Sequence, residues 1–315
     1  MPRPNEVHVD VAVSGFTLDY YKVIAQDYIG PQVAPVLNSD KQSNLYFVTK
    51  RKSRLQDIRR GPGDVYKTVD WGYGDNPFFC KGYGASVPVP AELAANADPQ
   101  INVDMDAVAA VMDTVMINAE NRVANLLFSD AVMVYGDALE GTAKWDSSAP
   151  DPWGCRKIAN ASVSPKIGRK VNTMVINDDT WEVLRDLSVV RERIYGTTGP
   201  QGVPTIAQVA AILGLDQIWI GKASDFNEDT EEYVALWGNF ALFAYYPTSV
   251  NENMGHITVP ARTFVWNVDK VGRFQVSAPV FDASRKSDIR YVDDYTDEKA
   301  VCPEAAYLFA DVLGG

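Results

Sequence analysis

The sequence is poor in the residues that hold metal ions or form cross-links. It contains three cysteines, Cys80, Cys155 and Cys302, which are widely separated and include no CxxC pair. An odd number of scattered cysteines indicates neither a disulfide framework nor a cysteine-based zinc site, and it fits synthesis in a reducing compartment. Histidine occurs twice, as His8 and His256, and neither belongs to an HExxH motif or a catalytic triad pattern. We therefore expect no metal and no cofactor.

Motifs for nucleotide binding and hydrolysis are also missing. There is no GxSxG nucleophile elbow, and the only Walker-like fragment fails because Gly221-Lys222 is followed by Ala223. Gly72-Tyr-Gly74 and Gly82-Tyr-Gly84 do not complete GxGxxG, so we interpret them as turn glycines. The sequence lacks the EF-hand pattern of glycine and terminal glutamate in its late acidic stretch, which holds Asp288, Asp293, Asp294, Asp297 and Glu298.

Positive charge and long apolar runs are scarce. The chain has 29 lysines and arginines against 41 aspartates and glutamates, a formal net charge of -12. Binding nucleic acid through its phosphates requires clustered positive charge, so this balance argues against a protein that grips DNA tightly. No stretch approaches the ~18 successive apolar residues of a membrane span, and the N-terminus lacks a signal-peptide pattern. The 315 residues, 46% of them hydrophobic, can nevertheless bury a large core.

The longest helical pattern runs from residue 104 to residue 130, with no glycine or proline inside it. Asp104 or Asp106 is expected to cap its start. At 1.5 Å per residue, this helix would be a rod of about 35 Å, around which we expect the fold to be organised. The three-and-four spacing that predicts a single buried stripe is set by Val108, Val111, Met112, Val115, Ala119, Val123, Leu126 and Leu127.

A polar, basic segment interrupts the β-rich region before this helix. Residues 44–50, 65–71 and 78–83 are predicted strands, with a turn at residues 72–77. The stretch between the first two strands has a Gly61-Pro62-Gly63 tip and cannot bury itself, so we expect it to project. Two interpretations stay open for it, a solvated loop and a docking arm that meets acidic surface on another copy. Its candidate contact residues are Lys50, Arg51, Lys52, Arg54, Arg59 and Arg60.

Residues 171–257 have α/β character of their own. A buried strand at 171–177 precedes a helix that Asp178 or Asp179 is expected to cap. Thr205 and Gln208 form a capping box for a further helix that ends at Gly214. A strand at 217–220, an acidic loop at 222–232 and two apolar strands between 233 and 246 follow.

The late segments are strand-like again. They cover residues 258–268, 273–276 and 289–293, with a closing apolar piece at 305–312. We expect these strands to lie beside the long helix, which makes residues 171–257 an insertion. Residues 1–40 have too little apolar surface to fold alone, and we expect this arm to lie on another surface, such as a neighbouring subunit.

The order of these parts resembles the major capsid proteins of tailed phages, which share the Johnson, or Hong Kong 97, fold. Local sequence is also similar to the lambda-type capsid branch, at KVNTMVINDDTWEVLRDL (170–187) and DIRYVDDYTDEKAVCPEAAYLFADVL (288–313). The resemblance covers nearly the whole chain and rests on the order of parts. It implies an α+β fold with an N-terminal arm (1–43), an extended β-ribbon loop (44–103), a spine helix with the first part of a peripheral domain (104–170), an axial domain (171–257) and the second part of the peripheral domain (258–315).

By this resemblance the chain is a structural subunit and not an enzyme. Its copies would assemble as hexamers and pentamers into an icosahedral phage head, which encloses double-stranded DNA without sequence-specific binding. The head would be assembled in the host cytoplasm and form the virion, without contact with a membrane. Implied partners are scaffolding and portal proteins, with a decoration protein as an open option. An encapsulin-like nanocompartment and a carbohydrate-active hydrolase are kept as alternatives.

Overall fold

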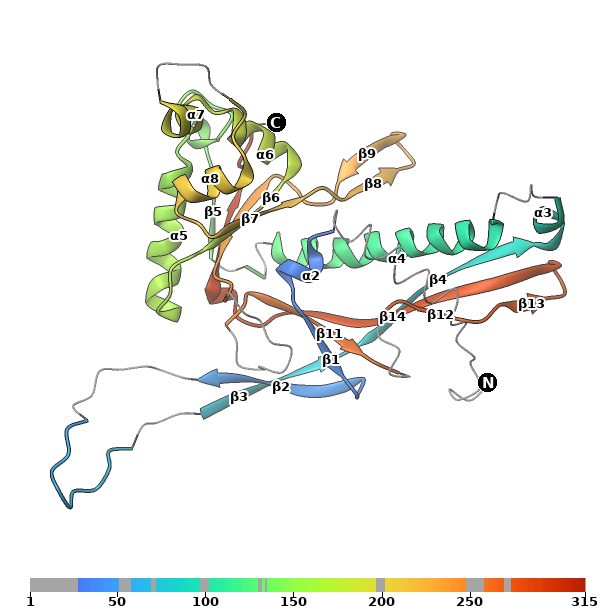
Figure 1. The fold of residues 1–315 in the computed structure, drawn as a ribbon, viewed down its shortest axis with the longest axis horizontal. Helices are drawn as coiled ribbons and strands as arrows, with labels where there is room; N and C mark the ends of the chain where they lie inside the picture. The colour runs from blue at the N-terminus through green and yellow to red at the C-terminus, as the bar shows by residue number, and fades with distance from the viewer. Residues whose placement is uncertain are drawn as a thin grey trace.

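The computed structural model describes residues 28–50, 58–68, 72–96, 102–129, 132–133, 135–196, 202–247, 258–268 and 273–314. Within these ranges a long helix lies along an extended sheet, and a compact α/β unit lies at one end of that helix. A two-stranded ribbon projects away from both (Figure 1). Both histidines and residues 1–27 of the expected arm lie outside the described ranges.

The long helix, α4 (Val103–Leu127), confirms the longest helical pattern in the sequence. Every residue of the expected apolar stripe is buried except Leu126, which is half-buried. The expected cap is wrong, because Asn102 precedes the helix and its side-chain oxygen accepts a hydrogen bond of 3.2 Å from the Met105 backbone N–H. Asp104 and Asp106 lie in the first turn instead, where their charges meet the positive end of the helix dipole.

A six-stranded sheet lies under α4. The path β1-β11-β14-β12 runs through it, and β4 and β13 also pair with β14. The late strands β11, β12 and β14 therefore lie beside the long helix together with early ones, as predicted from the sequence. The closing apolar piece at residues 305–312 does not, because it contributes a strand to the other, five-stranded sheet. The helix and sheet share a core of Val108, Met112 and Val115 with Val276 and Val292. The strands are β1 (Val36–Ser39), β4 (Lys81–Pro90), β11 (Ala261–Trp266), β12 (Gln275–Val276), β13 (Val280–Asp282) and β14 (Ser287–Ala300).

Two glycines of β4 allow β14 to approach closely. A Cβ atom at Gly84 would lie 2.6 Å from the Asp293 carboxylate, and one at Gly82 would lie 3.0 Å from the Tyr295 ring. These glycines lie in a strand, so their interpretation as turn glycines is wrong. The late acidic stretch lies in a strand, because residues 288–298 all fall within β14.

The α/β unit is built on a five-stranded sheet in the order β5-β15-β10-β6-β7. Its side chains alternate between two cores, as the two-residue period of a strand requires. Met174 and Ile176 of β6 face one hydrophobic cluster, and Val175 between them faces the other. Two of its strands, β5 and β15, come from outside residues 171–257. The strands are β5 (Gly136–Ala138), β6 (Thr173–Asn177), β7 (Gln217–Gly221), β10 (Phe240–Ala244) and β15 (Ala306–Ala310).

Four helices contribute to the first of these cores. The capping box of Thr205 and Gln208 and the left-handed Gly214 that ends α8 are both confirmed. The cap of α6 is Asn177, rather than Asp178 or Asp179, because the Asn177 side chain accepts the Thr180 N–H. The sequence analysis missed α5 and α7. The helices are α5 (Pro152–Ile167), α6 (Asp178–Asp186), α7 (Ser188–Tyr195) and α8 (Ile206–Leu213).

The projecting ribbon is formed by β2 (Ser43–Lys50) and β3 (Gly72–Phe79), which pair antiparallel from Ser43–Phe79 to Lys50–Gly72. The strand expected at residues 65–71 is not formed at residues 65–68, and residues 69–71 lie outside the description. The expected turn at residues 72–77 is strand β3 instead. Glycine and Pro77 fit this strand because a two-stranded ribbon leaves each strand with one unpaired edge.

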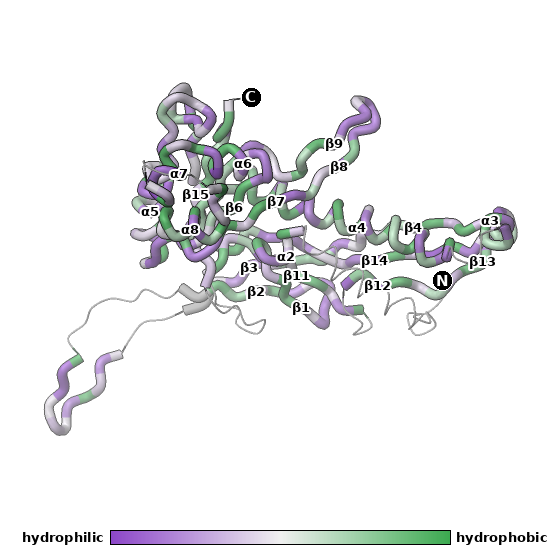
Figure 2. Tube along the Cα trace, turned by 45° about the horizontal axis from the view of Figure 1, so that its top comes forward, coloured by the Kyte–Doolittle hydropathy of each residue, from purple (hydrophilic) through white to green (hydrophobic). Residues whose placement is uncertain are grey.

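The expected acidic loop at residues 222–232 is also wrong. It contributes β8 (Ser224–Asn227), which pairs with β9 (Glu232–Ala235) in a second two-stranded sheet. Figure 2 shows the strongly hydrophilic tip of this hairpin, which stands clear of the apolar elements around it. The remaining described elements are the short helices α2 (Gly30–Val33) and α3 (Ala91–Asn96) and the 3-10 turns η2 (Gly141–Ala143) and η3 (Pro303–Ala305).

Replacing Thr114 with proline should unfold the subunit. Thr114 is exposed in the middle of α4, where proline removes an i→i−4 backbone hydrogen bond and clashes with the preceding turn, at a cost of about 3 kcal/mol or more. Thr114→Ala is the matched control, because alanine keeps the backbone bond. Thermal unfolding followed by circular dichroism should show a strongly lowered midpoint for the proline variant alone. Equal midpoints would contradict a continuous structural role for α4.

Candidate functional site

The described residues contain no group of three or more His, Cys, Asp or Glu side chains that could hold a metal ion. Their three cysteines are free. In the part of the chain that is described, no helix is both long enough and apolar enough to span a membrane. Two other features are candidates for a functional role. One is a buried polar junction on α4, and the other is the exposed surface of the projecting ribbon.

Glu120 forms the centre of the buried junction. Its carboxylate Oε1 accepts hydrogen bonds from the Ile29 backbone N–H at 3.0 Å and from the Trp237 indole Nε1–H at 2.8 Å. Its Oε2 accepts the Gly30 backbone N–H at 2.8 Å. The glutamate side chain is 2% exposed, so it lies on the buried face of α4 among apolar neighbours. One carboxylate thus connects the segment before β1, the long helix and the α/β unit.

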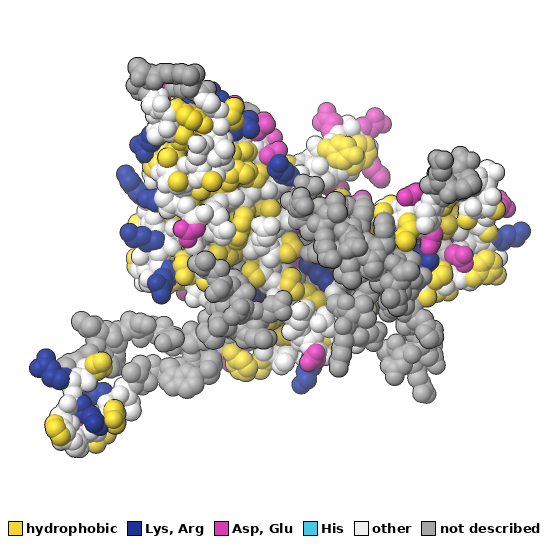
Figure 3. All heavy atoms as spheres, in the orientation of Figure 1, with side chains coloured by type: hydrophobic (Ala, Val, Ile, Leu, Met, Phe, Trp, Pro, Cys, Tyr) yellow, Lys and Arg dark blue, Asp and Glu magenta, His cyan; other side chains and the backbone are white. Residues whose placement is uncertain are grey.

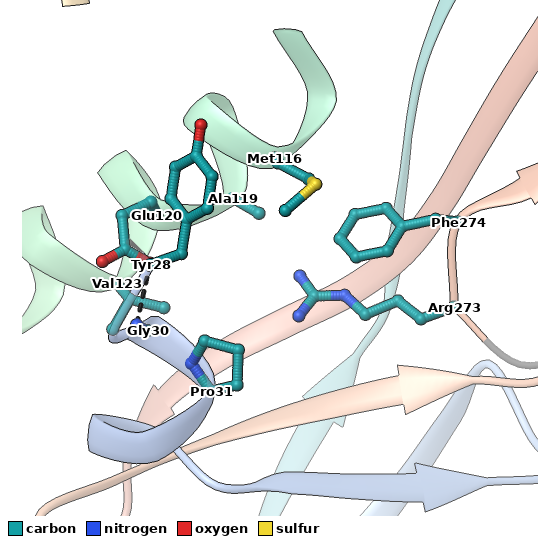
Figure 4. Close-up of a pocket in the computed structure, with 9 residues that line it drawn as sticks. All are labelled: Tyr28, Gly30, Pro31, Met116, Ala119, Glu120, Val123, Arg273 and Phe274. Carbon is teal, nitrogen blue, oxygen red and sulfur yellow. Dashed lines mark hydrogen bonds between the residues drawn. The ribbon is translucent and has the colours of Figure 1, made fainter. Parts of the chain in front are cut away.

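The sequence around the junction is constrained by its tight packing. A Cβ atom at Gly30 would lie 2.4 Å from Glu120 Oε2, so a larger residue there would displace the carboxylate. Burial raises the pKa of Glu120, although the three hydrogen bonds to its carboxylate oppose this effect. Figure 4 shows Glu120 at one side of a small pocket between α2 and α4, with Arg273 and Phe274 at the other side.

Ion pairs attach α4 to β14 near both ends of the helix. Arg122 Nε lies 3.2 Å from both carboxylate oxygens of Glu298, and its guanidinium stacks 3.7 Å over the Tyr83 ring of β4. Asp294 is buried and accepts two 3.0 Å hydrogen bonds from Arg273. A buried carboxylate must be paired to avoid a large desolvation cost, so Asp294 fixes the register of β14 against its neighbours.

The second attachment lies at the start of α4. Arg290 of β14 is buried, and its Nε donates a 3.0 Å hydrogen bond to the Asp104 carboxylate. The acid thus pairs with β14 in addition to facing the helix dipole. Helix α4 and strand β14 are therefore held together near the start of the helix and again in its second half, with an apolar core between the two attachments.

The base of the projecting ribbon is fixed to the six-stranded sheet. Phe78 of β3 stacks on Phe264 of β11 with ring centroids 4.4 Å apart, and the Phe79 backbone N–H donates a 2.9 Å bond to Asp297. Beyond this base the ribbon extends away from the rest of the molecule (Figure 1). Leu45, Phe47 and Phe79 are exposed along it.

The tip of the ribbon, residues 58–68, has local order of its own. A turn is closed by the Asp64 N–H, which donates to the Gly61 carbonyl at 3.1 Å, and by the Gly61 N–H, which donates to the Asp64 carboxylate at 2.9 Å. The Arg60 guanidinium lies 4.0 Å over the Tyr66 ring. The tip exposes Ile58, Val65 and Tyr66, and Val65 is 90% exposed.

The structure places the six candidate contact residues only in part. Lys50 is the last residue of β2, and Arg59 and Arg60 lie at the ribbon tip. Arg51, Lys52 and Arg54 lie outside the described residues. Sequence analysis did not identify Glu120, although its position four residues after Met116 and four before Ala124 places it on the buried face of the helix. That polar residue inside an apolar stripe was the available signal.

Substitution of Glu120 should change stability in a way that depends on pH. Because the folded-state pKa is raised above the ordinary value of 4.5, the contribution of Glu120 is fully present below that value and is lost as pH rises through the folded pKa. Glu120→Gln removes this titration. The unfolding free energy of the native protein, measured by denaturant titration, should therefore fall relative to Glu120→Gln as the pH rises from 4.5 to 8.

Glu120→Ala is the second variant in this experiment. It leaves three buried donors without an acceptor and should cost about 3 kcal/mol or more at every pH. A difference between the native protein and Glu120→Gln that stays constant with pH would contradict the raised pKa. An unchanged stability of Glu120→Ala would contradict the role of the junction.

Comparison with known proteins gives both sequence relatives and structural neighbours. No protein-family model matches the chain. It is 22% identical over 251 residues to the major capsid protein of Burkholderia phage BcepMu, and the alignment covers 76% of each protein. It is 25% identical over 183 residues to the major capsid protein of Pseudomonas phage JBD67, which covers 56% of this chain and 58% of that protein.

Solved structures agree in architecture. A phage-related protein from Bordetella bronchiseptica RB50 superposes with a TM-score of 0.76 at 21% identity, over 98% of this chain and 99% of that one. A structure from Microbacterium phage Oxtober96 superposes with a TM-score of 0.57 at 9% identity, over 90% of this chain and 91% of that one.

These findings confirm the resemblance stated from the sequence. Both sequence relatives are phage proteins, so the encapsulin-like and hydrolase alternatives are not favoured. The assignment to the lambda-type branch stays a prediction. The chain is similar to phage major capsid proteins in sequence and has the Hong Kong 97-like capsid fold, and both findings support a structural shell subunit rather than an enzyme.

Proposed function

We propose that copies of this chain assemble as hexamers and pentamers into an icosahedral phage head that encloses double-stranded DNA. The observation that carries this proposal is the projecting ribbon, which is anchored at its base and exposes apolar and basic side chains along its length and tip. An exposed apolar surface of this kind marks a site of contact with another protein. The head would be assembled in the host cytoplasm and become part of the virion.

The parts of the subunit take up distinct places in this proposal. Residues 1–43 form the N-terminal arm, residues 44–103 the extended loop, and α4 the spine of the peripheral domain. The axial domain is centred on residues 171–257 and also takes in β5, α5 and β15, because these elements pack on its sheet or pair within it. The six-stranded sheet combines the late strands of the peripheral domain with β1 from the arm and β4 from the extended loop.

The charge of the chain fits a container for DNA that does not hold its contents tightly. With a net charge of -12, the subunit offers few positive groups to neutralise phosphates. Weak, sequence-independent contact lets a packaged genome move during filling and release. Scaffolding and portal proteins are proposed as partners, and a decoration protein stays an open option.

The six basic residues of the loop are proposed to act between subunits. Lys50, Arg59 and Arg60 lie on the ribbon, and the sequence places Arg51, Lys52 and Arg54 between β2 and the tip. Exposed charges contribute little to the stability of a monomer, typically about 0–1 kcal/mol for a pair. They do steer and orient a partner, and small gains at each contact are multiplied over a closed shell.

Reversing Arg59 and Arg60 to glutamate should leave the subunit folded and impair its assembly. The expected result is an unchanged far-UV spectrum together with shell formation lowered about tenfold in negative-stain images and by light scattering. The control variant with lysine at both positions keeps the charge and should assemble normally. Normal shell yield from the glutamate variant would discard the role of these two arginines.

The native protein tests the proposed function itself. When it is co-expressed with scaffold, microscopy should show closed shells or their hexamers and pentamers. A strictly monomeric species at high concentration under these conditions would contradict the proposal.

A further inference from the structure

The β8–β9 hairpin is a surface that the proposed function does not yet use. It is a two-stranded sheet of its own, and an isolated pair of strands is marginally stable in water. Its residues from Ser224 to Ala235 include five acidic side chains and no basic one. Those five residues are Asp225, Glu228, Asp229, Glu231 and Glu232.

Aromatic and apolar side chains are exposed on the same hairpin. Phe226 and Tyr233 are directly opposite each other in the strand pair, and their rings are 5.2 Å apart in an edge-on arrangement. Tyr233 is 74% exposed, and Val234 is also exposed. Figure 3 shows this apolar group surrounded by carboxylates at the end of the hairpin. A cluster of exposed rings with charges around it has the composition of a protein contact surface.

The tip of the β2–β3 ribbon has the complementary chemistry. Residues 58–68 of the tip carry three basic residues and one acidic residue, a formal charge of +2 against -5 for the hairpin. The tip also exposes apolar side chains, among them Val65 and Tyr66. Opposite charge would orient the two surfaces, and burial of the exposed rings and aliphatic groups would stabilise their contact.

The two surfaces cannot meet within this conformation of one subunit. The ribbon tip and the β8–β9 hairpin lie at opposite sides of the molecule in both orientations drawn (Figures 1 and 2). From the charge and shape of these two projections, we propose that the ribbon tip of one copy docks on the β8–β9 hairpin of a second copy. This inference rests on the proposed shell function and specifies which surface receives the ribbon.

The symmetry of such a contact agrees with assembly into rings. Tip and hairpin are different surfaces of the same subunit, so each copy donates one and offers the other. A head-to-tail contact of this kind closes into a ring when the rotation between neighbours divides a full turn. Hexamers and pentamers require this property, and a contact between two identical surfaces would stop at a dimer.

A charge exchange between the two surfaces tests the docking. The ribbon variant carries Arg59→Glu and Lys67→Glu, which leaves Arg60 in place on the Tyr66 ring that supports the tip. The hairpin variant carries Glu228→Lys and Glu232→Lys. Both hairpin positions are exposed, so neither substitution disturbs a core. The combined variant carries all four changes. The control carries Glu92→Lys and Glu140→Lys, two exposed positions outside the hairpin that give the same change in net charge.

Each two-residue variant should form shells about tenfold less well than the native protein, whereas the control should assemble normally. The combined variant should recover most of the native yield, because the two reversed charges face each other again. Normal assembly of the hairpin variant would overturn the proposal. A combined variant that assembles no better than the two-residue variants would also overturn the proposal, because the two surfaces would then act at separate places. Failure of the native protein to form shells would reject the proposed function instead.

Chemical cross-linking identifies the contact directly. Shells assembled from equal amounts of ¹⁴N- and ¹⁵N-labelled subunits are treated with a carbodiimide, which joins Lys67 to a carboxylate in direct contact with it. Mixed-isotope peptides that join Lys67 to residues 225–232 are expected. Cross-links from Lys67 only to other regions of the neighbouring copy would overturn the assignment of the hairpin.

Discussion

The buried carboxylate of Glu120 is the interaction on which the arrangement of the subunit depends. Three donors, two from the segment before β1 and one from Trp237, converge on it. The helix that carries it also joins two cores. Its earlier turns pack on the six-stranded sheet, and Val123, Ala124 and Leu127 pack against the five-stranded sheet. The long helix and the Glu120 contact thus both contribute to the relative position of the two sheets.

The contacts that fix the six-stranded sheet to α4 also determine where the projecting ribbon leaves the molecule. The ion pairs of Arg122 and Arg290 hold β14 against α4, and the ion pair of Arg273 with Asp294 holds the segment before β12 to β14. Aromatic stacking at Phe264 holds the base of the ribbon to the same sheet. The base of the projecting ribbon is therefore carried by a sheet that is fixed to the long helix. A contact surface on a rigid support loses little conformational freedom when it meets a partner, which favours association.

The parts of this structure that sequence could predict are those with local signals. The apolar stripe of α4 repeats every three or four residues, and the capping box involves Thr205 and Gln208, which are three residues apart. Strand β3 was misplaced because GYGDNP has turn chemistry, and its pairing with residues 43–50 overrides that preference. The basic ribbon was visible in composition, whereas Glu120 was not identified as a junction because its partners lie 90, 91 and 117 residues away. Interactions of that separation leave no periodic pattern.

The position of β15 in the five-stranded sheet has a consequence for synthesis. Residues 306–310 lie between β5 and β10, in the interior of the sheet rather than at its edge. A nascent chain that has not yet emerged to residue 310 exposes the facing edges of two strands and half of a hydrophobic core. This unit therefore cannot be completed before residue 310 has been synthesised, and contacts of such long range form slowly.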